Sequence, residues 1–418
     1  MKPAYLSLAV FSLLLFISCK KELSKQNQFI KSFKADFDLA AVASFQMNDG
    51  NYLIAGFDQL NIQSGQLLKL DASGEMIWEK PLTPLIKIIW SAFPVPSSGF
   101  VTFGIHDYDS HAMYMCLYDN NGNLLSTDSI VTGAANYDKT PYNMMLLTNG
   151  NYVMAGGLSL SPSYGVRILS PTFQVLTSHS YIPPAGMRLT YCKAMCELPD
   201  ASIGIAATVS VSNGDRKNLF LVKTDLDGNF ITSNFIEDTI HSETANVIAP
   251  HNGGILAITG KMTGFSFGGD VASSSNDGIA VNYYGSYNDY GRLISGTINL
   301  DQFTTDAQLT SAREIHDYPN NGMMNSIRTT NDGGYILCGT VNQQSTYLVE
   351  SDTKIYLLKL NADLNEQWSK IIYTTYPSYG VDAMQTSDGG YLVTGFHKTL
   401  GKRFEAMVIK TDASGNFN

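Results

Sequence analysis

The chain has 418 residues, of which 44% are hydrophobic and 15% are charged, and its formal net charge is −10 at pH 7. This composition excludes an intrinsically disordered chain and is sufficient for a large buried core. The negative charge argues against nucleic acid as a partner, because an acidic surface repels phosphate backbones.

The first residues are typical of an exported protein. Lys2 precedes an apolar run of about fourteen residues, which is too short to span a bilayer because a transmembrane helix needs about 20 residues. We therefore interpret residues 1–18 as a signal peptide. Residues 16–19, with the sequence Phe-Ile-Ser-Cys, resemble the lipobox of bacterial lipoproteins. An ordinary signal peptide followed by an unrelated cysteine is the alternative.

The lipobox resemblance implies that the signal is cut before Cys19 and that this cysteine carries a lipid. Residues 19–27 then form a polar tether. Lys20 follows the cysteine at the position where an aspartate typically retains such proteins at the inner membrane. The resemblance therefore implies an exported protein that contacts a membrane through its lipid anchor only, with the outer membrane favoured and the leaflet left open.

One sequence phrase recurs seven times in the remaining chain. An apolar stretch leads to a polar turn and then to a second apolar stretch, as in Asn-Asp-Gly-Gly-Tyr-Ile-Leu-Cys-Gly at 331–339 and Ser-Asp-Gly-Gly-Tyr-Leu-Val-Thr-Gly at 387–395. Successive copies are separated by 48, 52, 51, 52, 80 and 56 residues. The aromatic or apolar residues that open the second stretch are Tyr52, Phe100, Tyr152, Ile203, Ile255, Tyr335 and Tyr391.

A second phrase follows the first in most copies and adds another hairpin. It is a strand, a turn that begins with Asp and ends with Gly, and a further strand, as at 67–75 and 408–416. Asp begins such turns by binding nearby backbone, and Gly tolerates the positive φ that ends them. Each repeat therefore holds four strands in about 50 residues, which indicates one propeller blade. We predict an all-β, seven-bladed propeller of four-stranded antiparallel blades over residues 28–418.

The two ends of the predicted ring complement each other. Trp368 precedes Tyr391 by 23 residues, and Phe29 precedes Tyr52 by the same interval. Residues 28–34 therefore correspond to an outer strand without a blade of its own, whereas the last residues of the chain complete a turn and stop before an outer strand. We predict that strand 28–34 completes the seventh blade and closes the ring.

Two propeller families are similar in short motifs. Residues 388–395 resemble the second strand of kelch-type repeats, and residues 70–78 and 360–368 look like the end of quinoprotein-type repeats. The second resemblance implies that Trp78 and Trp368 dock between blades. These families include enzymes, scaffolds and binding proteins, so the resemblance implies the fold and leaves the function open.

Because strands alternate in direction, the connections divide between two faces of the ring. The short hairpin turns are predicted on one face and the variable loops on the other, where binding sites are usually built. The 80-residue step adds extra residues within 261–323, placed at 263–277 and at 301–321, and blade six adds 341–352. We expect blades five and six to form a wall on the variable face.

Several variable-loop residues are candidate ligand contacts. The segment 106–111 gathers two histidines and two aspartates, and aromatic rings elsewhere suit sugar rings or partner side chains. The alternative is that the tyrosines pack between blades. The candidates are His106, Asp107, Tyr108, His111, Tyr287, Tyr290, Tyr347, Tyr376 and His397.

No metal site, catalytic residue or cofactor is assigned from the sequence. Loops rich in Asp and His are common without a metal, and the remaining cysteines fit small buried hydrophobic residues. Cys192 and Cys196 lie four apart in one predicted strand, about 13 Å at 3.3 Å per residue, which is too far for a disulfide.

Two functions remain open from the sequence. The first is a monomeric, non-enzymatic binding or scaffolding module for a protein or glycan partner in the cell envelope. The second is an enzyme that acts on extracellular polysaccharide or uses a quinone, with a site on the variable face. Carboxylates from separate blades would serve the second; the candidates are Asp58, Asp107, Asp317 and Asp382.

Overall fold

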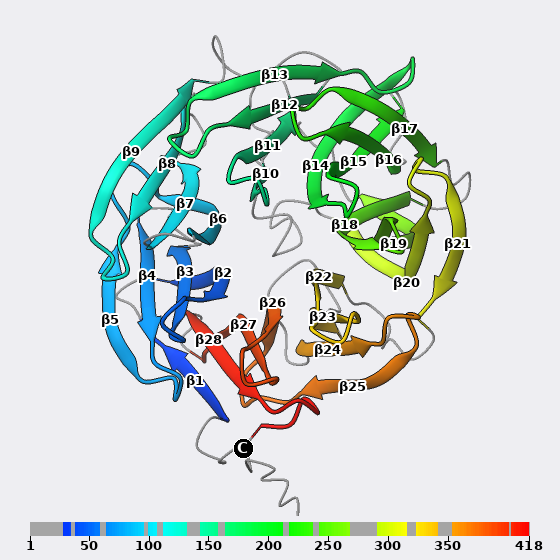
Figure 1. Cartoon of the computed structure of the whole chain (residues 1–418). Coiled ribbons are helices and arrows are strands. Elements are labelled where there is room, and N and C mark those ends of the chain that lie inside the picture. Colours follow the sequence, from blue (N-terminus) through cyan, green and yellow to red (C-terminus); the bar gives the residue numbers. More distant parts are fainter. Residues whose placement is uncertain are drawn as a thin grey trace, which may run out of the picture.

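The computed structural model describes thirteen segments of the chain and places them in a ring of antiparallel sheets (Figure 1). The described residues are 28–34, 38–58, 64–95, 99–106, 112–131, 143–157, 164–211, 217–236, 242–267, 291–315, 323–341, 353–400 and 403–417. Within these segments the chain forms 28 strands in seven sheets of four strands each. The predicted seven-bladed propeller is confirmed.

Each blade runs from an inner strand at the axis to an outer strand at the perimeter. Blades one to four comprise β2 (Leu39–Gln46), β3 (Tyr52–Asp58), β4 (Gly65–Leu70) and β5 (Met76–Pro81); β6 (Ile88–Val95), β7 (Gly99–Ile105), β8 (Ala112–Tyr118) and β9 (Leu124–Val131); β10 (Asn143–Leu146), β11 (Tyr152–Gly157), β12 (Tyr164–Leu169) and β13 (Val175–Tyr181); and β14 (Met187–Glu197), β15 (Ser202–Val211), β16 (Lys217–Asp225) and β17 (Phe230–Ile236). Blades five to seven comprise β18 (Ser242–His251), β19 (Gly254–Phe267), β20 (Gly291–Phe303) and β21 (Leu309–Glu314); β22 (Met323–Thr329), β23 (Tyr335–Val341), β24 (Lys354–Leu360) and β25 (Glu366–Ile372); and β26 (Ser378–Gln385), β27 (Tyr391–Lys398), β28 (Phe404–Thr411) and β1 (Phe29–Phe33).

The first strand of the chain closes the ring, as predicted. β1 pairs antiparallel with β28, with Phe29 opposite Lys410 and Phe33 opposite Ala406. The seventh sheet therefore has the order β1-β28-β27-β26, in which both ends of the chain share one blade. Figure 1 shows β1 beside β28 at the bottom of the ring.

Aromatic side chains of outer strands seal neighbouring blades. Trp78 in β5 lies against Gly122 in the β8–β9 turn of the next blade, and Trp368 in β25 lies against Gly415 in the turn after β28. The predicted docking of both tryptophans between blades is confirmed. Gly122 has a φ of 72°, and a Cβ atom there would lie 2.7 Å from the indole of Trp78. Glycine is needed at this turn both for its backbone conformation and for its lack of a side chain.

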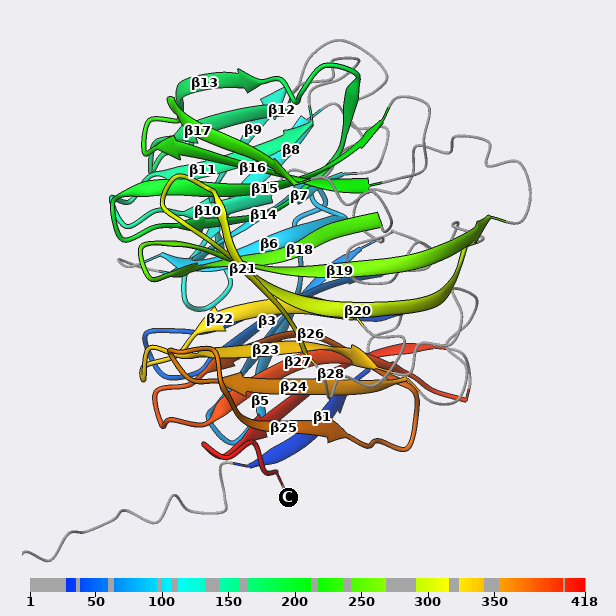
Figure 2. The same cartoon turned by 90° about the vertical axis from the view of Figure 1, so that its right-hand side faces the viewer.

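The hairpin turns that the structure describes lie on the same side of the ring, here called the hairpin face. The described connections between blades, such as those before β6 and β26, lie on the opposite side, the loop face. Figure 2, a side view, shows the short turns on the left. In each turn after a third strand, the first residue donates its N–H to a carbonyl four residues later, as Asp71 does to Glu75. This shared geometry makes the hairpin face uniform, as the sequence predicted.

The extra residues between blades five and six do not lie where the sequence predicted them. Residues 301–314 were expected to be extra, but they form the end of β20, a turn and the outer strand β21. The turn from Thr304 to Gln308 has the usual hydrogen bonds, but Ala307 adopts the positive φ of 58° that glycine adopts in blades one, two, four and seven. The outer strand was missed because its turn lacks the glycine signal.

The blade-five insertion instead extends the two middle strands. β19 has 14 residues and β20 has 13, and they pair out to Phe267 and Gly291. Figure 2 shows this pair projecting beyond its neighbours on the loop face, so the expected wall is confirmed for blade five. The blade-six part, after Val341, lies outside the described residues. In the described part of the chain, no helix is long and apolar enough to cross a membrane.

Candidate functional site

Buried lysines hold one hairpin turn in each of four blades on the hairpin face. In four blades a lysine of the third strand binds the aspartate of the turn between the first two strands. These pairs are Lys69–Asp49 at 2.7 Å, Lys223–Asp200 at 2.7 Å, Lys359–Asp332 at 2.9 Å and Lys410–Asp388 at 3.0 Å. The lysine side chains are at most 6% exposed. The sequence carries a signal for these lysines, because each one directly follows a run of apolar residues within its strand.

In these pairs, each charged group shifts the pKa of its partner toward the ionised form. Burial alone would raise the pKa of Asp332, but hydrogen bonds from Thr330 and Lys359 outweigh burial and lower that pKa to about 2. Burial lowers the pKa of Lys410, which Asp388 partly opposes. The turns are therefore held by ion pairs that form only while the carboxylates are ionised.

On the loop face, the structure brings together two of the predicted candidates. Tyr376, in the connection before β26, packs edge-on against His397 at the end of β27, with ring centroids 5.5 Å apart. His397 Nε2 lies 3.3 Å from the Glu405 carboxylate at the start of β28. His397 is 7% exposed and Glu405 is 8% exposed. His397 therefore presents little surface to a ligand. Lys34, which follows β1, contacts Glu405 at 3.7 Å, so Tyr376, His397 and Glu405 lie beside the end of the closing strand.

The other predicted candidates are not brought together by the described structure. His106, directly after β7, is half-buried and takes part in an interaction with its surroundings. The remaining candidates, Cys19, Asp107, Tyr108, His111, Tyr287, Tyr290 and Tyr347, lie outside the described residues. Their proposed roles stay predictions.

The axis of the ring carries an ion pair that sequence reasoning did not anticipate. Arg328 of β22 donates two hydrogen bonds to the Asp382 carboxylate of β26, at 3.0 Å from Nε and 2.5 Å from Nη2. A longer contact of 3.5 Å reaches the Ser44 carbonyl of β2. Asp382 was a candidate carboxylate for catalysis, but here it binds Arg328, which links three successive inner strands. Asp58 is 2% exposed, and the other two candidate carboxylates lie outside the described residues.

The inner strands share a backbone irregularity near this ion pair. Six of the seven inner strands, where the structure describes their pairing, shift register by one residue at the same distance from the hairpin turn. In β22 the extra residue is Asn325, whose side-chain amide donates to the Gly380 carbonyl of β26 at 2.6 Å. Such bulges redirect side chains, and here the redirected amide joins neighbouring blades.

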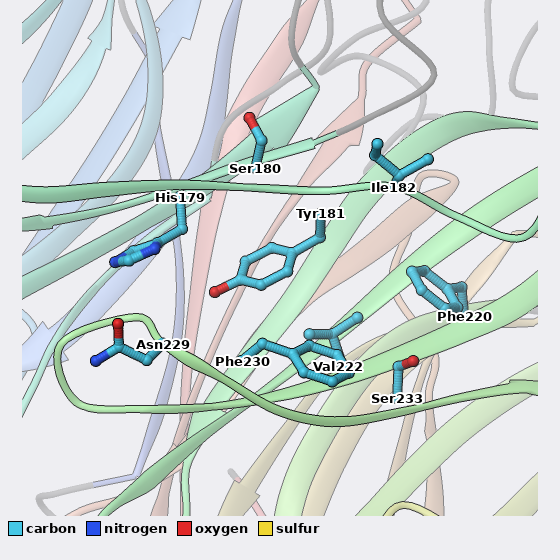
Figure 3. A pocket seen from close by; sticks show the side chains of 9 residues that line it. All are labelled: His179, Ser180, Tyr181, Ile182, Phe220, Val222, Asn229, Phe230 and Ser233. Carbon is cyan, nitrogen blue, oxygen red and sulfur yellow. The ribbon is translucent and has the colours of Figure 1, made fainter.

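A cleft on the perimeter, the rim cleft, is a candidate ligand site. It lies between β13 of blade three and β17 of blade four and has a volume of about 490 Å³. Figure 3 shows His179 and Tyr181 projecting from β13 toward β17, whereas Ser180 points away. The lining residues are His179, Ser180, Tyr181, Ile182, Phe220, Val222, Asn229, Phe230 and Ser233.

The rim cleft lies at one of the four blade junctions where strand register places a serine or threonine instead of an aromatic residue at the sealing position. By strand register, Thr177 occupies the position that Trp78 and Trp368 hold in their blades. The Thr177 hydroxyl binds the Asp227 carbonyl at 2.5 Å, but a threonine fills less space than an indole. Tyr181, four residues later, reaches the same turn and donates to the Gly228 carbonyl. Sequence reasoning missed this cleft because it depends on residues about 50 positions apart.

The cysteines match the expectation of buried apolar residues where they are described. Cys116, Cys196 and Cys338 are buried and unpaired, and burial raises the pKa of Cys116 and of Cys196 to about 12. Cys192 lies in the same strand as Cys196, as predicted. Among the residues that the structure describes, no group of three His, Cys, Asp or Glu side chains has the arrangement of a metal site.

The ring of seven four-stranded sheets defines the chain as a seven-bladed β-propeller. Comparisons with known proteins do not assign it to a family. No family model matches the sequence, and no curated protein matches it. The kelch-type and quinoprotein-type resemblances therefore stay predictions.

Solved structures share the general shape at low similarity. A protein of unknown function from Dyadobacter fermentans aligns at a TM-score of 0.48 and 10% identity, covering 91% of this chain and 98% of that chain. An endo-arabinase from Bacteroides thetaiotaomicron aligns at a TM-score of 0.37 and 9% identity, covering 67% and 95%. A prolyl endopeptidase aligns at 0.46 and 13%, covering 88% of this chain and 48% of its own. These likenesses carry no argument about function.

Proposed function

We propose that this chain is an envelope-anchored lipoprotein whose propeller is a non-enzymatic binding module for a protein or glycan partner. The observation that carries the proposal is the rim cleft, a preformed hollow of mixed polarity on a closed, rigid ring. Its volume falls within the range of about 300–1,000 Å³ that is typical of ligand pockets. The buried Lys223–Asp200 pair holds a hairpin turn of blade four, and Tyr181 of blade three donates to the Gly228 carbonyl of blade four. These contacts hold the two walls, which reduces the entropy lost on binding.

The lining of the rim cleft indicates the kind of partner that fits. Phe230 is 56% exposed and offers an aromatic face, with the Tyr181 ring 6.2 Å from it. Asn229 and Ser233 add polar groups on the same wall. An aromatic face beside hydrogen-bonding groups suits a sugar ring or a partner side chain that is apolar on one side and polar on the other.

The anchor belongs to the same proposal. Residues 16–19 support lipid attachment at Cys19, and the tether 19–27 leads directly to Gln28 and the start of β1. The module is then a monomer held close to a membrane, with the outer membrane favoured and the leaflet open. A short tether restricts the module to partners in the envelope near that membrane.

The test has two readouts on the full chain produced in a bacterium. Mass analysis of the N-terminal peptide should show acylated Cys19, and Cys19→Ser should abolish the acyl mass and release the protein from membranes. A glycan array and cross-linking in envelopes should identify a partner whose binding is lost in Phe230→Ala. The control is Tyr373→Ala, which removes an aromatic ring that is 71% exposed elsewhere on the ring. Equal binding by both variants would contradict the role of the cleft.

A further inference from the structure

The exposed apolar residues of the ring follow a regular pattern. Of the thirteen large apolar side chains that are exposed in the described part of the chain, ten are the first or second residue of an outer strand. These ten, here called the apolar rim, are Ile30, Met76, Ile77, Leu124, Leu125, Val175, Leu176, Phe230, Ile231 and Leu309. A set this regular marks an interaction surface more strongly than scattered residues would.

The pattern places the apolar rim beside the hairpin face. Every outer strand that follows a turn begins at the hairpin face and runs toward the loop face, so its first two residues lie at the perimeter next to the turns (Figure 2). The other three exposed apolar residues lie at the opposite ends of strands. Ile182 follows β13, Tyr373 follows β25, and Leu400 follows β27. Exposed apolar residues therefore begin the outer strands near the hairpin face, whereas near the loop face they occur singly after strand ends.

The tether reaches the ring at the same edge. Phe29 begins β1 opposite Lys410, one residue before the end of β28, where the chain turns on the hairpin face. Residues 19–27 can span at most about 30 Å, at 3.3–3.6 Å per residue. A lipid on Cys19 therefore keeps a membrane within about 30 Å of the point where β1 begins. Along the perimeter β1 lies between β5 and β25, and β9 lies beyond β5 (Figure 1). β25 begins with the exposed polar residues Glu366 and Gln367, so the apolar stretch next to the tether runs from β1 through β5 to β9.

We propose that this edge of the apolar rim, formed by Ile30, Met76, Ile77, Leu124 and Leu125, rests on the lipid surface that holds the anchor. The loop face then points away from the membrane, toward the envelope space. This inference rests on the proposed lipid attachment at Cys19 and adds a second, non-covalent contact with the same membrane.

The side chains around this edge suit a lipid–water interface. Lys80 lies over the Trp78 ring at 5.5 Å, and Lys31 lies over the Phe29 ring at 5.5 Å. Long cationic side chains beside aromatic rings can extend their charge into the headgroup layer while their stems cover apolar surface. The same edge provides both the apolar and the amphipathic residues of an interfacial contact.

The charges at this edge give the contact a distinctive salt dependence. Lys31 is paired with Glu75 at 2.5 Å, and Lys80 donates to the Asn121 carbonyl at 2.6 Å. Asp71 and Asp119 of the adjacent turns stay ionised, because hydrogen bonds to their carboxylates lower their pKa. The edge is therefore without excess positive charge, and apolar burial drives the contact. Added salt should leave it intact, unlike a contact through basic residues.

The experiment compares the two faces in the lipidated full chain. The protein is inserted through its anchor into vesicles of phosphatidylcholine and phosphatidylethanolamine. Ile77→Cys and Leu400→Cys, each carrying an environment-sensitive fluorophore, are exposed to brominated lipid. We expect quenching of the label at 77 and none at 400, at both low and high salt. Equal quenching at the two positions, or quenching at 400 alone, would overturn the proposed orientation.

Two further measurements keep the outcomes distinct. Mass analysis of Cys19 is made on the same sample: absence of the acyl group would overturn the proposed function and this inference together, whereas an acylated chain with the wrong label quenched would overturn the orientation alone. The variant Met76→Glu/Leu125→Glu should lose quenching at position 77 while remaining membrane-bound through its lipid. Tyr373→Glu, at the loop face, is the matched control and should leave the quenching unchanged.

Discussion

The ring of Phe29 lies directly against Gly74, so the first strand of the propeller contacts the turn of the blade that follows it. A Cβ atom at Gly74 would lie 2.4 Å from the Phe29 ring, and Gly74 has a φ of 78°. Gly50 has a similar φ of 83°, but a Cβ atom there would meet nothing within 4 Å. Substitutions at these two glycines therefore separate the free-energy cost of backbone strain from that of a steric clash.

We predict that Gly50→Ala lowers the free energy of unfolding by about 1 kcal/mol, through backbone strain alone. Gly74→Ala should lower it by about 2–4 kcal/mol, because overpacking against Phe29 adds about 1–3 kcal/mol. Urea denaturation of both variants measures the difference. Equal losses would show that Phe29 does not occupy the position described.

Removing the ring itself tests the same contact from the other side. Phe29 is 7% exposed, so Phe29→Ala should lower the free energy of unfolding by about 3 kcal/mol, as for other buried aromatic residues. The neighbouring Ile30 is 36% exposed, and Ile30→Ala should cost less than 1 kcal/mol. Thermal and urea denaturation of the two variants would contradict the account if Ile30→Ala were the more damaging change.

The ion pair between Lys359 and Asp332 predicts a specific pH dependence. The pKa of Asp332 is lowered in the folded state to about 2, so its contribution to stability is present above the ordinary value of 3.8. That contribution is lost as the pH falls from 3.8 toward 2, because protonation removes the charge that Lys359 binds. Asp332→Asn should therefore be less stable than the parent at pH 7, and the gap should narrow at acid pH.

A second variant distinguishes the pair from other acid effects. Lys359 is 3% exposed, so Asp332→Asn leaves a buried charge without its partner. Lys359→Met in the Asp332→Asn background should recover part of the loss at pH 7, and a double-mutant cycle measures the coupling. A gap between parent and Asp332→Asn that stayed constant from pH 7 to pH 2 would contradict the pairing.

Breaking the axial ion pair between Arg328 and Asp382 should cost more stability than breaking the exposed ion pair between Lys34 and Glu405. Asp382 is 8% exposed at its side chain, and Arg328→Met would leave its carboxylate buried without a cation. We expect a loss of about 3 kcal/mol in the free energy of unfolding. Lys34 contacts Glu405 at 3.7 Å but is 80% exposed, so Lys34→Met should cost less than about 1 kcal/mol. The Arg328 side chain is itself 44% exposed, so the effect depends on the Asp382 carboxylate, and similar losses in both variants would refute the burial of that carboxylate.

The blade repeat could be predicted because its turns require particular residues. Gly74 and Gly122 adopt positive φ, a conformation that other residues rarely accept, so the turns left a clear sequence signal. The equivalent turn before β21 uses Ala307 instead, and that outer strand was missed. The closing strand was predicted from one interval, that between Phe29 and Tyr52, which matched the interval before Tyr391.

The candidate sites could be predicted far less well, for a physical reason. The rim cleft depends on a threonine, Thr177, in one blade and on the turn around Gly228 in the next, and a single-sequence pattern does not relate such positions. Tyr376 and His397 were named as separate candidates, but their contact follows from the blade geometry. The four buried lysines could have been found, since a lysine such as Lys410 within an apolar strand requires a partner.

Hydrogen–deuterium exchange of the mature full chain tests the closed ring most directly. β1 pairs with β28 on one side only, so alternate amides of residues 29–33 should exchange slowly, together with those of β28. A peptide covering 29–33 that exchanged at the rate of an unfolded chain, while β27 and β28 stayed protected, would contradict closure of the propeller by its first strand.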